Sequence, residues 1–167
     1  MATPSDHIAL ANKNQAALEH LQKEAARFPE WVCTTAFYKA VQICEAMFVS
    51  DNGKNCHDHG NRLRRIKTGK YQEMYRAYRI LWSASTVARY LHDNDKKQDY
   101  CTFTDYIPAE QVEEKIVRNR LQDFEGKSLK FLGELGKSLQ RSHVANKTKK
   151  PYVAKSKETP EETPDKK

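Results

Sequence analysis

A 35-residue stretch of this sequence, residues 56–90, gathers the side chains best suited to contact a polyanion. It holds eight lysines and arginines against two acids, Asp58 and Glu73, which gives a formal charge of +6. Tyrosines lie between these cations. Cations neutralise phosphates and aromatic rings stack on bases, so the composition predicts binding of RNA or a nucleotide. The side chains that we expect to contact phosphate are Arg62, Arg64, Arg65, Lys67, Arg76 and Arg79.

Two residues of this stretch are also candidates for catalysis. His57 can act as a general acid or base at a ribose 2′-hydroxyl, because imidazole titrates near neutral pH. Arg62, just over one helical turn further along, can stabilise the negative charge that develops on phosphorus. A divergent, metal-independent ribonuclease using His57 and Arg62 is therefore one hypothesis. We favour the alternative hypothesis, that the stretch binds RNA or a nucleotide without cleaving it.

A metal site at the start of the stretch is a third possibility that the spacing does not favour. Thiolate and imidazole suit zinc, but a structural zinc site needs four convergent ligands at a recognisable spacing. Cys56, His57 and His59, with His92 or Cys101 further along, fit no such pattern. We therefore expect no metal and no cofactor, and interpret these residues as polar loop positions, one histidine capping a short helix.

The overall composition limits the class of protein. The 167 residues suffice for one domain. Charged residues make up 31% and hydrophobic residues 38%, with a mean hydropathy of −0.87 and a net charge of +7. No stretch approaches 18 consecutive apolar residues, and none has the character of a signal peptide, so we expect no membrane partner and a cytoplasmic protein. The four cysteines form no disulfide framework, which fits a reducing compartment.

The periodicity of apolar residues is helical almost throughout, and no strand pattern competes with it. Four long amphipathic segments with short connections predict an all-α antiparallel four-helix bundle with a short extra helix. The sequence after His143 has almost no apolar residues, so we divide the chain into a bundle, 1–143, and a disordered, Lys-rich tail, 144–167. The expected long helices cover residues 3–27, 29–50, 70–92 and 108–143, and the short basic helix lies within 54–69.

Several residues within these helices carry specific expectations. The segment 29–50 is apolar on most sides, which predicts a central helix with Trp31 and Phe37 buried. Tyr71, Tyr75 and Tyr78 share one helical face and are interpreted mainly as core. Arg76 and Arg79 are expected to point outward, and Arg89 and Tyr90 to anchor to the second helix through Tyr38. Gly126 is the expected position of a kink in the last helix.

Four segments of residues 6–91 follow one another in a recognisable order. They are DHIALANKNQAALEHL, WVCTTAFYKAVQICEAMFV, CHDHGNRLRRI and YRAYRILWSASTVARY. This order resembles the HEPN superfamily, the higher eukaryote and prokaryote nucleotide-binding domains. In members of that family a Ser-His-x-x-x-x-Arg-like segment stands where this chain has CHDHGNRLRRI, and one branch of small members ends in a Tyr-rich YxxLYxxSxxARY pattern.

The resemblance implies a HEPN-like bundle that forms a homodimer and binds RNA or a nucleotide, in a toxin–antitoxin or defence module. An alternative is a protein–protein module that docks a partner enzyme such as a nucleotidyltransferase. The family's ribonucleases carry an arginine followed four to six residues later by a histidine. No arginine here is followed by histidine at that spacing, since His92 comes three residues after Arg89 and His143 two after Arg141. We therefore lean against an enzyme.

Overall fold

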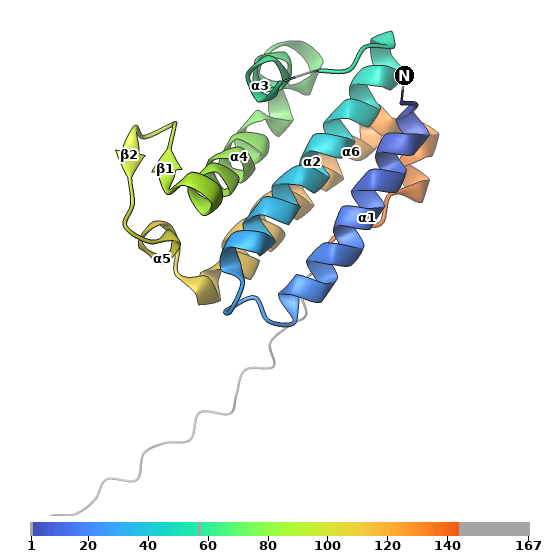
Figure 1. Cartoon of the computed structure of the whole chain (residues 1–167). Helices are drawn as coiled ribbons and strands as arrows, with labels where there is room; N and C mark the ends of the chain where they lie inside the picture. The colour runs from blue at the N-terminus through green and yellow to red at the C-terminus, as the bar shows by residue number, and fades with distance from the viewer. Residues whose placement is uncertain (1, 57, 144–167) are drawn as a thin grey trace, which may run out of the picture.

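The computed structural model describes residues 2–56 and 58–143, and this part of the chain is mostly helical, as the sequence predicts (Figure 1). His57 and the predicted tail, 144–167, lie outside the described residues. The described part departs from all-helical structure in a two-residue antiparallel pair that the sequence did not predict, β1 (His92–Asp93) with β2 (Gln98–Asp99). None of its helices is both long and apolar enough to cross a lipid bilayer.

The first helix, α1 (Pro4–Gln22), begins within one residue of the expected start at residue 3 and ends earlier than expected. Thr3 and Asp6 form a reciprocal capping box at its start. The backbone N–H groups of Lys23 and Glu24 then bond to carbonyls three residues back, at His20 and Leu21, and the chain turns. The predicted helical end near Arg27 is therefore wrong, because the bonding pattern tightens and closes the helix one turn sooner.

The second helix, α2 (Pro29–Asn52), is the central element. It packs against α1, which runs antiparallel beside it, and against α4 and α6 (Figure 1). Phe37 is fully buried, as predicted, but Trp31 is 61% exposed. Trp31 lies on the helical stripe that also carries Thr35, Tyr38 and Gln42, all of them partly exposed, so counting apolar residues misjudged its side of the helix.

The basic region forms a short helix followed by a longer one. α3 (His59–Lys67) is capped by Asp58, whose Oδ1 accepts from the Asn61 N–H at 2.7 Å, so the cap is not a histidine. The predicted helix 70–92 is divided into a 3₁₀ segment, η1 (Gly69–Met74), and α4 (Tyr75–Tyr90), which ends at Leu91 in a left-handed conformation.

The last predicted helix, 108–143, is divided into four segments. Its expected kink at Gly126 is wrong, because Gly126 lies inside α6 and the helix ends at Gly133, whose φ of +55° suits glycine. The four segments are η2 (Ala109–Gln111), the π-helix η3 (Glu113–Leu121), α6 (Gln122–Leu132) and the 3₁₀ segment η4 (Gly133–Ser138). A further short helix, α5 (Phe103–Tyr106), comes before η2 in the sequence.

A buried ion pair fastens the last described residues to the core. Lys39 and Glu125 are both fully buried, with Nζ 2.6 Å from Oε1. Nζ also donates to Gln15 at 2.5 Å and to the Gln140 carbonyl at 2.7 Å. The other carboxylate oxygen of Glu125 accepts the backbone N–H and the hydroxyl of Ser142, each at 2.9 Å. α1, α2, α6 and residues 139–143 thus share one polar network within an apolar core.

Candidate nucleic-acid interface

Arg62, the arginine named for both catalysis and binding, is buried rather than presented to solvent. Its side chain lies against Glu45 of α2, with Nε 2.7 Å and Nη2 2.6 Å from Oε1. Nη2 also donates to the Cys56 carbonyl at 2.8 Å, and Nη1 lies 2.9 Å from Nδ1 of His59. Glu45 in turn accepts the Cys56 N–H at 2.8 Å. Every edge of the guanidinium is occupied, so Arg62 attaches α3 to α2, and this geometry does not fit phosphate contact.

His59, which the sequence placed among possible metal ligands, belongs to the same cluster. Its ring is half-buried against Phe37, with 5.1 Å between ring centroids. Burial, followed by the positive charges of Arg62 and Arg89, lowers the pKa of His59 below its usual 6.5. The neutral ring suits the hydrogen bond from Arg62, because only an unprotonated Nδ1 can accept it. Among the residues described, no group of three or more metal-ligating side chains is found.

The pKa of His59 predicts a pH dependence of stability. The unfolded chain takes up this proton near pH 6.5, whereas the folded chain resists it, so the free energy of unfolding should fall as pH drops below that value. His59→Gln keeps an acceptor for Arg62 but removes the proton site. Urea unfolding between about pH 7.5 and about pH 5 should therefore show a smaller loss of stability in the variant. Equal losses in both proteins would show that His59 does not contribute.

Three further cations of the basic stretch pair with carboxylates. Arg65 lies 3.6 Å from Asp51 at the end of α2, and Lys70 contacts the same carboxylate. The Nε of Arg79 lies 3.2 Å from Asp95, in the turn between β1 and β2. Both carboxylates, Asp51 and Asp95, lie outside residues 56–90 in the sequence. The formal charge of +6 counted for this stretch is therefore larger than the charge left without a partner.

Four cations of the stretch remain: Arg64 and Lys67 on α3, Arg76 at the start of α4, and Arg89 near its end. Lys67 and Arg76 are exposed, and no carboxylate among the described residues pairs with either. Arg64 is also exposed and donates to the neutral amide of Asn61 at 2.8 Å. Tyr75 is half-buried, with Lys67 Nζ 5.9 Å from its ring centroid. We call Arg64, Lys67, Tyr75 and Arg76 the cationic surface.

The tyrosines divide between the core and this surface. Tyr71 and Tyr78 are buried, as predicted, and Tyr78 packs on Phe37 and Phe124 with centroids 5.6 and 5.8 Å apart. Tyr75 alone of the three keeps part of its ring exposed. The change from 3₁₀ to α-helical geometry at Tyr75 alters the spacing, and so separates it from the face that Tyr71 and Tyr78 share.

A second exposed patch was not predicted. Trp31 and Tyr90 are 61% and 67% exposed, and both are neighbours of Arg89. The guanidinium of Arg89 lies 5.0 Å from the ring of Tyr90, and with Trp31 it lines a hollow of about 340 Å³ between α2 and α4. Arg89 also donates to the Tyr38 hydroxyl at 3.3 Å, as expected. The expectation that Tyr90 anchors the same helix end is wrong, because its side chain is exposed. The exposure of Trp31 could have been predicted from the sequence, because Thr35, Tyr38 and Gln42 follow it at helical spacing and are polar.

Comparison with protein-family models, with curated proteins and with solved structures found no significant match to this chain.

Proposed function

We propose that this protein binds single-stranded RNA through the cationic surface, as a cytoplasmic protein with a HEPN-like, antiparallel four-helix arrangement. The observation that carries the proposal is that, among the described residues, no carboxylate pairs with Arg64, Lys67 or Arg76, and Lys67 lies over the half-buried Tyr75. The basic residues nearest to them in the sequence, Arg62, Arg65, Lys70 and Arg79, are paired. Phosphates would neutralise the three cations, and a base would stack on Tyr75.

The packing of α2 against α1, α4 and α6 supports a bundle of the proposed kind (Figure 1). The homodimer and the toxin–antitoxin or defence module remain part of the proposal through the resemblance described above. We do not extend the proposal to ribonuclease activity, because the guanidinium of Arg62 is occupied by Glu45, His59 and the Cys56 carbonyl.

Replacing Arg64, Lys67 and Arg76 together with glutamine tests the proposal. For a fluorescent single-stranded RNA, the slope of log affinity against log salt should become shallower by about 2, since each lost phosphate contact contributes about 0.7. The melting temperature should change little, because all three side chains are exposed. A matched control replaces three exposed cations, Lys13 on α1 and Lys23 and Arg27 just after it, and removes the same charge. α1 and α4 lie on opposite sides of α2 (Figure 1).

The second candidate function is protein docking, which the exposed Trp31 and Tyr90 favour, because clustered exposed aromatic residues are enriched at protein interfaces. Under the RNA proposal, Trp31→Ala with Tyr90→Ala should leave the salt slope unchanged. Absence of RNA binding by the wild type at low salt, or equal losses in the triple variant and its control, would reject the RNA proposal in favour of docking.

A further inference from the structure

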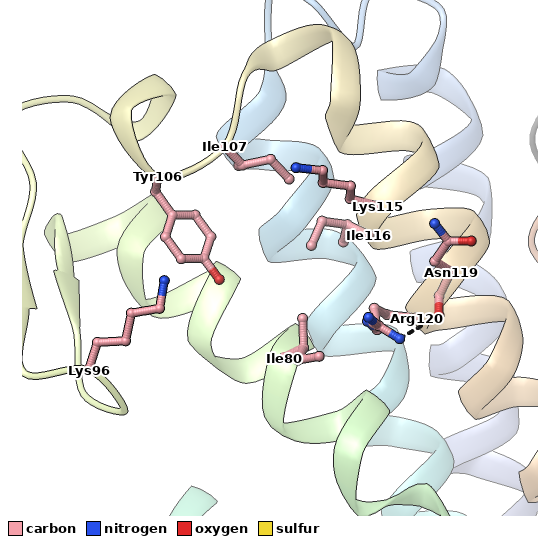
Figure 2. Close-up of a pocket in the computed structure, with 8 residues that line it drawn as sticks. All are labelled: Ile80, Lys96, Tyr106, Ile107, Lys115, Ile116, Asn119 and Arg120. Atoms are coloured by element: carbon pink, nitrogen blue, oxygen red, sulfur yellow. Dashed lines mark hydrogen bonds between the residues drawn. The ribbon is translucent and has the colours of Figure 1, made fainter.

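A hollow of about 310 Å³ lies between α4, the turn between β1 and β2, the segment after α5 and the π-helix η3 (Figure 2). Its size is at the lower end of the range of small-molecule sites. Figure 2 shows Lys96 and Tyr106 on one side and η3 on the other, with isoleucines between them. The lining residues are Ile80, Lys96, Tyr106, Ile107, Lys115, Ile116, Asn119 and Arg120.

Three of the lining side chains are cationic, and none of the described residues that line the hollow carries a carboxylate. Within the described part of the chain, Lys96, Lys115 and Arg120 have no ion-pair partner. Lys96 lies over the ring of Tyr106, 5.6 Å from its centroid, and Arg120 donates only to the Asn119 carbonyl at 3.3 Å. Arg118, on the same helix, pairs instead with Glu114 at 3.0 Å. Like charges around one hollow repel each other, and an anion would relieve that repulsion.

The side of the hollow formed by η3 depends on its π-helical geometry. Hydrogen bonds from residue i to residue i+5 widen the helix, so Lys115 and Arg120, five residues apart, face the same space. Ile116 and Asn119 lie between them. π-Helical segments are rare and are found frequently at functional sites.

The opposite side is held in place by a buried carboxylate. Asp93, 1% exposed, accepts from the Ser83 hydroxyl at 2.6 Å and from the backbone N–H groups of Asp95 and Lys96 at 2.9 and 3.4 Å. These bonds fix the turn that carries Lys96. Burial, and after it the negative charge of Asp93, raises the pKa of Tyr106 to about 12. A phenol is protonated at neutral pH even without this shift, so the Tyr106 hydroxyl is able to donate.

We propose that this hollow binds a small phosphate monoester that carries a planar ring. The phosphate is held by the cations, and the ring lies on Ile80, Ile107 and Ile116. An inorganic anion would leave the isoleucine floor unused, and an uncharged ring would leave the cations unneutralised. The inference goes beyond the RNA-binding proposal and does not depend on it, because no residue of the cationic surface lines the hollow.

Calorimetric titration of the full chain tests this site with phenyl phosphate, AMP, inorganic phosphate and phenol as probes. Phenyl phosphate or AMP should bind at least about tenfold more tightly than inorganic phosphate, since burying a ring is worth that much or more. Phenol should bind weakly. Equal affinity for phenyl phosphate, AMP and inorganic phosphate, or no binding of either ester, would overturn the proposal.

Two variants on the same helix separate this site from general charge effects. Arg120→Gln should weaken binding of the tighter ester by about tenfold or more, because a hydrogen bond to a charged group is lost. Arg118→Gln removes the same charge outside the hollow and should leave binding unchanged. Equal losses in both variants would also reject the site.

The triple variant of the cationic surface distinguishes the two proposals. Replacing Arg64, Lys67 and Arg76 with glutamine should leave the affinity for phenyl phosphate and AMP unchanged. If the variant lost ester binding, the esters would be bound at the cationic surface and the hollow would be rejected. In this variant, displacement of AMP by a short RNA with a 5′-phosphate, and not by one with a 5′-hydroxyl, would identify the end of an RNA as the source of the ester. Displacement by neither RNA would identify a free small molecule as the source.

Discussion

Replacing Glu125 with alanine is expected to lower the free energy of unfolding by roughly 3–5 kcal/mol, because it leaves the ammonium group of Lys39 buried without its counter-charge. Both side chains are fully buried, 2.6 Å apart. Burial already lowers the pKa of Lys39, and the carboxylate of Glu125 opposes that effect. The variant also removes the acceptor for the N–H and the hydroxyl of Ser142. Chemical denaturation followed by circular dichroism measures the change.

The double variant Lys39→Met with Glu125→Leu is the control for this prediction. It removes both charges and keeps apolar volume, so it should be more stable than Glu125→Ala alone. The pairing explanation would be contradicted if the double variant were the less stable of the two. A protease that cuts near residues 139–143 should act faster on Glu125→Ala, because the network holds that segment against α2 and α6.

The second large effect is expected at Phe37, and Trp31 provides its control on the same helix. Phe37→Ala should cost roughly 3–5 kcal/mol, because it leaves a cavity in the core beneath Tyr78. Trp31→Ala should cost far less, since its side chain is 61% exposed. Urea unfolding of the two variants measures the loss of free energy of unfolding at each position. A loss at Trp31 equal to that at Phe37 would show that Trp31 is covered in solution, as a docking face or a dimer interface requires.

The local elements of this protein were largely determined by its sequence. The helices expected to start at residues 3 and 29 begin in the structure at Pro4, after the N-cap Thr3, and at Pro29. The apolar content of residues 29–50 identified the central helix and the burial of Phe37, and the spacing of tyrosines placed Tyr71 and Tyr78 in the core. These features depend on neighbours within about one or two helical turns, which a sequence displays directly.

The environment of each charged residue was decided only by the tertiary structure. The count of basic residues in 56–90 did not separate Arg62, buried against Glu45, from Arg76, which is exposed. Lys39 and Glu45, two charges in the most apolar helix, were the signal in the sequence that partners from elsewhere must enter the core. Those partners are Glu125 and Arg62, distant in sequence and brought close only by packing.

The hollow between α4 and η3 could not be predicted from the sequence either, because packing brings its residues together from separate segments. Its cations come from a turn near residue 96 and from a helix near residues 115–120. The pattern of residues 108–143 predicted a continuous α-helix with a kink at Gly126, and neither the π-helical geometry of η3 nor the break at Gly133 followed from it. The sequence determined which segments form helices, and packing decided which charges stay free, because pairing depends on distances that only the folded chain sets.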